Sequence, residues 1–90
     1  MKNLATLLTN MNSPSEAKKA CELMFTDSEL KIFELRIAII KALLSGQSSH
    51  REIAANLGVS ISKITAGSKA VQKANKATLE KFREVFNIKH

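Results

Sequence analysis

The chain of 90 residues carries a formal net charge of +6, a sequence pI near 9.8 and a single cysteine, Cys21. This length fits one domain, 1–90, whose core is small enough that dimerisation is expected to complete it. An internal disulfide, a zinc site and a membrane span are excluded, because there is one cysteine, the two histidines stand forty positions apart, and no apolar run approaches about 20 residues.

The first third of the chain predicts two short helices, because no segment alternates apolar and polar residues for long enough to form a strand. Ser13 followed by Pro14 and Glu16 is a capping signal, in which the serine accepts a hydrogen bond and the glutamate reaches back. It predicts the start of the second helix. The apolar residues that share a face are Leu4, Leu7, Leu8 and Met11 in the first helix, and Ala17, Ala20, Cys21 and Met24 in the second.

The longest predicted helix begins with a capping box formed by Thr26 and Glu29, runs to about Ser45 and stops at Gly46. At about 100° per residue it has two apolar stripes on nearly opposite sides. The stripes are Leu30, Phe33, Ile37, Ile40 and Leu44, and Ile32, Leu35, Ile39 and Leu43. A helix that needs cover on both sides is expected at the centre of an interlocked dimer; the alternative is a monomer whose other helices wrap it.

Three further helices are predicted in the C-terminal half, which makes six helices and an all-α fold. Ser49 and Glu52 form a third capping box, and the helix that it opens ends at Gly58. Ser60 and Asn75 are the expected caps of the last two helices. The residues expected to point inward are Ile61, Ile64 and Val71 in the fifth helix, and Leu79, Phe82, Val85 and Phe86 in the sixth.

The segment of about 49–73 predicts a helix-turn-helix. Ala54 is small where the second helix crosses the first, and Gly58 supplies the left-handed conformation that ends the first helix. The apolar residues expected to fix the crossing angle are Ile53, Leu57, Val59 and Ile64.

Charge points to a nucleic-acid partner on the same segment. Residues 1–45 carry six Lys/Arg and five Asp/Glu, a net of +1, whereas residues 46–90 carry eight and three, a net of +5. Arg51 has the planar guanidinium that can hold a guanine in two hydrogen bonds; the alternative is a surface charge paired with a glutamate. The second helix of the motif offers Ser62, Thr65, Ala66 and Lys69 outward, with Lys63 and Lys73 placed either for phosphates or as a solvated face.

Residues 23–74 resemble the Trp repressor family, in LMFTDSE, in LR before IAIIKALLSGQSSHREIAANLGVSISKITAGS, and above all in SHREIA followed by LGVSISKITAGS. The resemblance implies an intertwined, all-helical homodimer whose recognition helices meet successive major grooves of double-stranded DNA. It implies base and phosphate contacts at positions matching Arg51, Ile61, Ser62 and Thr65. Together with the charges, the candidate DNA-binding residues are His50, Arg51, Ile61, Ser62, Lys63, Thr65 and Lys69.

The resemblance also implies a corepressor site for L-tryptophan or a related small molecule. Its expected residues are Leu23 and Phe25 through their carbonyls, Thr26, Arg36 and Gly67. Ala66 replaces the arginine that covers the indole in the family, and Ala70 replaces a serine near the ammonium. Losing the arginine removes a stacking contact of about 1–2 kcal/mol, roughly a tenfold loss of affinity, so the sequence predicts weakened tryptophan binding.

Three of these residues also have readings that need no ligand. Arg36 projects between the two apolar stripes, where a charge needs an anionic partner, and Glu22 or Glu52 would serve as well as a ligand carboxylate. Thr26 is first of all a helix cap. A glycine inside a helix costs about 1 kcal/mol relative to alanine, so Gly67 calls for close helix packing or a ligand beneath it.

The sequence therefore predicts a dimeric, sequence-specific DNA-binding transcriptional regulator of the repressor type. It leaves open whether a small ligand controls the binding. The alternatives are a ligand-independent DNA-binding protein of the same fold and a helix-turn-helix module that binds protein partners. No acid–base pair, activated nucleophile or metal cluster is visible, so an enzyme is not expected. The lone thiol fits the reducing cytoplasm, and no membrane contact is expected.

Overall fold

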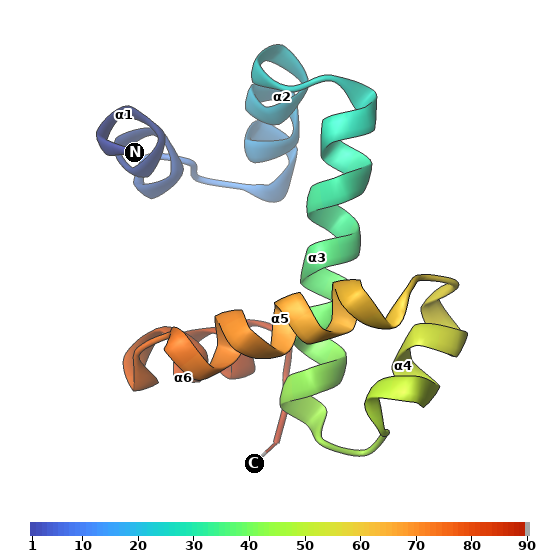
Figure 1. Ribbon diagram of the computed structural model, residues 1–90. Helices are drawn as coiled ribbons and strands as arrows, with labels where there is room; N and C mark the ends of the chain where they lie inside the picture. Colours follow the sequence, from blue (N-terminus) through green and yellow to red (C-terminus); the bar gives the residue numbers. More distant parts are fainter. Residues whose placement is uncertain (90) are drawn as a thin grey trace. The chain divides into compact units, whose positions relative to one another are not determined.

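The computed structural model describes residues 1–89, which form six α-helices and no strand. The helices are α1 (Lys2–Thr9), α2 (Pro14–Met24), α3 (Asp27–Ser45), α4 (His50–Leu57), α5 (Ile61–Lys73) and α6 (Lys76–Val85) (Figure 1). This architecture confirms the all-helical expectation. His90, the second of the two histidines, lies outside the described residues.

Side-chain caps begin most of these helices where the sequence predicts them. Thr26 and Glu29 exchange hydrogen bonds of 3.1 and 2.9 Å, and Ser49 and Glu52 exchange bonds of 3.1 and 2.8 Å, so both capping boxes are complete. Asn75 accepts from the Thr78 N–H at 2.8 Å. These caps satisfy N–H groups that the first turn of a helix leaves without a partner.

Two predicted caps differ in their chemistry. The Ser13 hydroxyl accepts from the Glu16 N–H at 3.1 Å, but among residues 1–89 the Glu16 carboxylate does not return the bond. Ser60 precedes α5 as expected, yet its hydroxyl caps nothing in that helix. The extended backbone at Ser60 is enough to start the helix without the side chain.

The chain divides into two compact units, Met1–Phe33 and the part from Glu34 onward, and α3 belongs to both. In the first unit, α1 and α2 contain no buried residue. Phe25, at the end of α2, meets the ring of Phe33 edge-on, with the ring centroids 4.9 Å apart. Met24 is 39% exposed, so it is not the inward residue that was predicted. Met11, expected on one face with Leu4 and Leu7, lies beyond the end of α1 and is partly buried. That both units fold as the single domain 1–90 stays a prediction.

The core of the second unit lies where α3, α4 and α5 meet. Ile39, Ile53, Ala54 and Ile64 are buried there, at 0 to 6% exposure. The residues packed around them are Leu35, Ala42, Leu43, Leu57 and Val59. Figure 1 shows α5 crossing the C-terminal half of α3, with α4 beside it. The predicted wedge residues therefore form the core, as expected.

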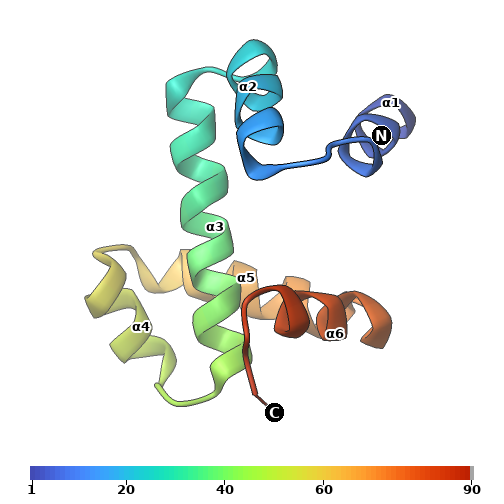
Figure 2. The ribbon, with the colours of Figure 1, turned by 180° about the vertical axis from the view of Figure 1, so that it is seen from behind.

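The helix α6 packs on the same C-terminal half of α3, as the view from behind shows (Figure 2). The Arg83 guanidinium donates to the Leu44 carbonyl at 3.0 Å, and the Lys41 ammonium lies 4.8 Å from the centroid of the Phe86 ring. Both apolar stripes of α3 are therefore covered toward the end of the helix and open near its start. Leu44 and Ile39 are buried, whereas Phe33 and Ile32, nearer the start of the helix, are 43% and 59% exposed.

Two residues predicted to point inward are exposed. Ile61 is 47% exposed because it is the first residue of α5, and Ile64, one turn later, takes the buried position. Val85 is 63% exposed. It is the last residue of α6 and lies at the edge of the face that carries Phe82 and Phe86, about 60° from the first and 100° from the second, and both phenylalanines are partly buried.

Candidate nucleic-acid interface

A tight turn built on Gly58 joins α4 to α5. Gly58 has φ +66°, the left-handed conformation that glycine adopts without strain. The N–H groups of Gly58 and Val59 donate to the carbonyls of Ala55 and Ala54, at 3.3 and 3.0 Å, so that the last turn of α4 is closed. The chain then leaves α4 in a fixed direction, and α5 begins three residues later.

Burial fixes how this helix pair is oriented. Ile53 and Ala54 of α4 and Ile64 of α5 are buried against each other and against Ile39 of α3. Because Ile53 is 2% exposed and Ile64 is fully buried, neither helix can rotate about its axis without exposing apolar surface. The opposite faces of both helices are thereby held toward solvent.

All seven candidate DNA-binding residues are exposed and belong to the second unit. His50 and Arg51 form the first turn of α4, and the other five lie on α5: Ile61, Ser62, Lys63, Thr65 and Lys69. The structure thus brings the predicted residues onto one pair of packed helices. It does not test their contacts with a nucleic acid.

The electrostatic surroundings of this pair favour an anion. No Asp or Glu occurs from Ile53 to Leu79. Glu52, the last acid before that stretch, is held in the capping box, where the Ser49 N–H and then the Ser49 hydroxyl lower the pKa of its carboxyl. The salt bridge within residues 1–89 joins Lys81 to Glu84 at 3.5 Å. Arg51 therefore has no glutamate partner in this range, although a surface ion pair was the alternative to its predicted contact with a guanine.

Comparison with known proteins relates most of the chain to one family. The family model described as Trp repressor protein matches residues 1–86. A Trp operon repressor homolog of Xylella fastidiosa strain M23 is 39% identical over 72 residues, which cover 80% of this chain and 78% of the relative. Another, of Chlamydia trachomatis serovar D, is 40% identical over 67 residues, covering 74% and 71%. A third, of Chlamydia caviae, is 37% identical over 78 residues, covering 87% and 73%.

The chain belongs to the Trp repressor family. This assignment confirms the resemblance that residues 23–74 carry and extends it to residues 1–86. The family is one of regulatory proteins. Within residues 1–89, no helix is long and apolar enough to cross a membrane, and no group of three or more His, Cys, Asp or Glu side chains could hold a metal ion.

The residues that the Trp repressor family would place at a corepressor site fall in both units. Leu23, Phe25 and Thr26 belong to the first unit, and Arg36 and Gly67 to the second. Thr26 acts as a helix cap, and Leu23 is 88% exposed. Neither observation tests a ligand role.

Arg36 is not the buried charge that helical projection predicted. Its side chain is exposed, and within the second unit it forms no salt bridge with Glu52. Glu22 belongs to the first unit, and its pairing with Arg36 stays a prediction. Arg36 lies one turn before Ile39 and Ile40, where the cover of the two stripes is still incomplete, and a long arginine side chain can reach water there. No internal anion is needed to explain it.

Gly67 has a structural reason that the sequence allowed for. It is buried where α5 crosses α3, and a Cβ atom added to it would lie 2.7 Å from Ile39 Cγ2 and 3.3 Å from Leu43 Cδ1. Real Cβ atoms essentially never show a contact of 2.7 Å, and 3.3 Å is tighter than nine in ten of their contacts. The close approach of the two helices therefore accounts for a glycine at this position.

Two cationic residues outside the predicted set bear on the same unit. Arg83 ties α6 to the last carbonyls of α3 through Leu44 and contacts the Lys89 carbonyl at 3.5 Å. Lys76 is exposed at the first position of α6. The sequence could have indicated Lys76 as a further candidate for nucleic-acid contact, because the acid-free run from Ile53 to Leu79 continues past the end of α5.

Proposed function

We propose that this chain is a sequence-specific DNA-binding transcriptional regulator that acts as a repressor by occupying operator DNA as a homodimer. The observation that carries the proposal is the α4–α5 pair, two helices locked by Gly58 and a buried wedge with their cationic faces exposed. This is the arrangement of a helix-turn-helix, in which the second helix enters a major groove. Membership of the Trp repressor family supports the same reading.

In this mode of binding, the start of α5 meets the base edges. Ile61, Ser62 and Thr65 lie in its first two turns and are exposed, so they are the residues that reach bases or their methyl groups. Arg51 reads a guanine from the first turn of α4. His50, Lys63 and Lys69 contact phosphates, which position the protein without reading sequence.

Exposed apolar side chains in the first unit support a homodimer. Large apolar patches on a small protein mark interaction surfaces, and a second copy is the partner that two-fold symmetric operators require. The exposed large apolar residues of this unit are Met1 (92%), Leu8 (54%), Leu23 (88%), Met24 (39%), Ile32 (59%) and Phe33 (43%). A second copy that covers these side chains would bury both apolar stripes of α3, as expected of an interlocked dimer.

A second candidate is the same DNA-binding protein without tryptophan control. Ala66, exposed on α5, offers no guanidinium to stack on an indole. Ala70 lines an apolar hollow of about 200 Å³ with Ile40 and Phe82. Its methyl side chain cannot accept a hydrogen bond from an ammonium group. These two residues favour a protein that binds DNA equally well with and without L-tryptophan, or that answers to a related small molecule.

Fluorescence anisotropy with duplex DNA tests both candidates. The purified chain is titrated into a labelled duplex between about 50 and 200 mM salt, with and without L-tryptophan, and we expect an affinity that falls steeply with salt. Tightening by L-tryptophan supports ligand control, and an unchanged affinity supports the ligand-independent form. The alternative of a protein-interaction module predicts no salt-dependent binding, and that result would overturn the proposal.

A further inference from the structure

An acid-free, lysine-bearing surface continues beyond the predicted helix-turn-helix. From Ile53 to Leu79 the chain carries no Asp or Glu, and its lysines are Lys63, Lys69, Lys73 and Lys76. All four are exposed, and the salt bridge within residues 1–89 involves none of them. The positive surface therefore runs past the end of α5 into the first turn of α6, which the predicted helix-turn-helix does not include.

Lys76 is placed where a positive charge disfavours the fold. It is the first residue of α6, whose first turn contains no acid to offset it. The N-terminus of a helix carries a partial positive charge of roughly +0.5, so a lysine there is repelled by the helix dipole. Lys73 differs, because it lies in the last turn of α5, where a cation stabilises the helix. Helix stability thus explains Lys73 but not Lys76.

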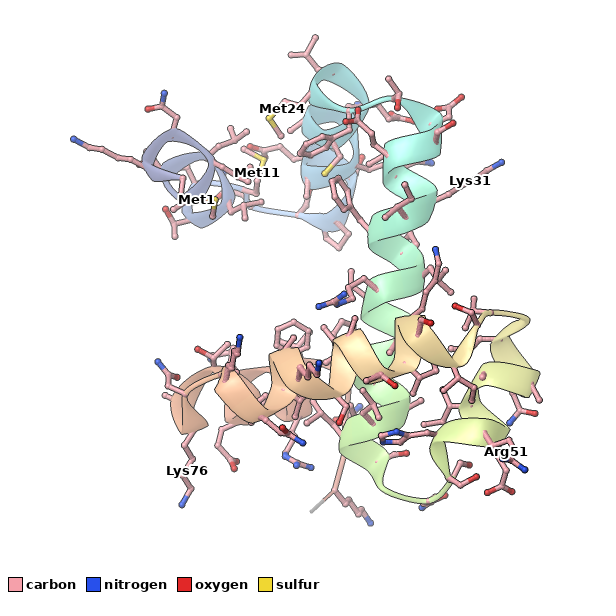
Figure 3. All side chains as sticks on the ribbon, viewed as in Figure 1. Met1, Met11, Met24, Lys31, Arg51 and Lys76 are labelled. Atoms are coloured by element: carbon pink, nitrogen blue, oxygen red, sulfur yellow. The ribbon has the colours of Figure 1, made fainter. Side chains whose placement is uncertain are left out.

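The reach of the second unit suits a surface longer than one groove. With 13 residues and a rise of about 1.5 Å per residue, α5 is about 20 Å long, whereas the major groove of DNA is about 12 Å wide. Figure 3 shows Arg51 and Lys76 at opposite ends of the α4–α5–α6 part of the chain. If the start of α5 enters the major groove, the rest of α5 extends past the edge of that groove. The phosphate backbone that borders the groove is then the part of the duplex nearest to the end of α5.

We infer that Lys76, together with Lys73, contacts the phosphate backbone flanking the base-reading site, which widens the DNA footprint past the recognition helix. The inference rests on the proposed function, because it assigns a further contact to the same partner. These lysines add affinity for any sequence and no preference between sequences. The unfavourable position of Lys76 in its own helix is then the cost of an intermolecular contact.

Lys76→Gln tests the inference, because its effects on folding and on binding are opposite. Without the repelled charge, the melting temperature is expected to rise slightly or stay unchanged. The slope of log affinity against log salt is expected to become shallower by about 0.9, which is roughly an eightfold loss of affinity at 0.1 M salt. Lys81→Gln is the matched control: it lies on the same helix, removes the same charge, and is already paired with Glu84. Both are measured by anisotropy on one duplex, and by thermal melting.

Each outcome decides a different point. A shallower slope for Lys76→Gln, with the slope of Lys81→Gln unchanged and the melting temperature maintained, supports the inference. If wild type binds DNA and Lys76→Gln keeps its slope, or if both variants lose the same amount, the contact is overturned and the proposed function stands. If wild type shows no salt-dependent binding, the proposed function itself fails. Lys73→Gln, measured alongside, is expected to lose a second increment of slope.

Discussion

Gly67 illustrates how one residue fixes the crossing of two helices. Alanine there gains about 1 kcal/mol of helix propensity, but its Cβ would lie 2.7 Å from Ile39 Cγ2, on a side chain that is 2% exposed. Overpacking of a core costs about 1–3 kcal/mol, so after the gain in propensity we expect Gly67→Ala to lower the free energy of unfolding by up to about 2 kcal/mol. Urea denaturation measures the change.

The same site offers its own control. Ile39→Leu removes the Cγ2 methyl group that the new Cβ would meet and keeps the side-chain volume. The double variant Ile39→Leu/Gly67→Ala should therefore be more stable than the sum of the two single changes predicts, which a double-mutant cycle detects. Strict additivity would show that the close contact is not the reason for the glycine.

Glu52 gives the stability of α4 a pH dependence. Hydrogen bonds from Ser49 lower the pKa of its carboxyl in the folded chain. A group whose pKa is lowered by folding stabilises the fold above its unfolded pKa, about 4.3 for glutamate, and this contribution is lost as the pH falls through the lower, folded pKa. Wild type should melt above Glu52→Gln at pH 7, and the difference should vanish in acid. A difference that persists unchanged at low pH would contradict this account.

Single residues also mark where prediction from sequence reached its limit. Gly58, Ala54 and Ile64 were predicted correctly, because their roles follow from local spacing. Arg36 and Ile61 were not, because helical projection gives the direction of a side chain but not how far along the helix its neighbours extend. Their exposure depends on packing between segments that are distant in sequence.

At the scale of elements, the turn between α4 and α5 depends on backbone conformation alone. A Cβ at Gly58 would meet nothing within 4 Å, so the cost of replacing it comes from φ +66° and not from crowding. We expect Gly58→Ala to destabilise the fold by about 1–2 kcal/mol, and Gly58→Asn to cost less, since asparagine tolerates this conformation. Chemical denaturation of both variants tests the order, and equal losses would contradict it.

The helix boundaries were largely predictable because caps and glycines act within a few residues. Both complete capping boxes, Asn75 and the two left-handed glycines Gly46 and Gly58 stand where the sequence placed them. The attachment of α6 was not predictable. It depends on Arg83 reaching Leu44, 39 residues away, and on Lys41 meeting Phe86, and neither contact leaves a local pattern.

At the scale of the whole molecule, the exposed apolar residues of the first unit predict self-association. Ile32 is 59% exposed, and replacing it by serine removes apolar surface that the proposed dimer would bury. Analytical ultracentrifugation should find wild type dimeric and Ile32→Ser shifted toward monomer.

Ile61→Ser is the matched control, because Ile61 is 47% exposed on the proposed DNA-binding face. It should remain dimeric and lose affinity for DNA. A monomeric wild type at micromolar concentration would remove the dimer from the account.

The family, the all-helical fold and the exposure of the proposed nucleic-acid face followed from the sequence, since the motif from His50 to Lys69 is contiguous. The corepressor question did not, because its residues are spread over both units and two of the family's positions carry alanine. Lys76 was not predicted, because the helix-turn-helix segment ends at Lys73 while the acid-free surface continues into α6.

The central claim is that the α4–α5 pair of a homodimer reads DNA sequence. Selection of duplexes from a random-sequence library by the purified chain tests it most directly. We expect a two-fold symmetric site to be enriched by wild type, and the enrichment to be lost in Arg51→Ala/Lys69→Ala while the fold is retained by circular dichroism. Recovery of no common sequence by wild type, or of the same site by the double variant, would contradict the account.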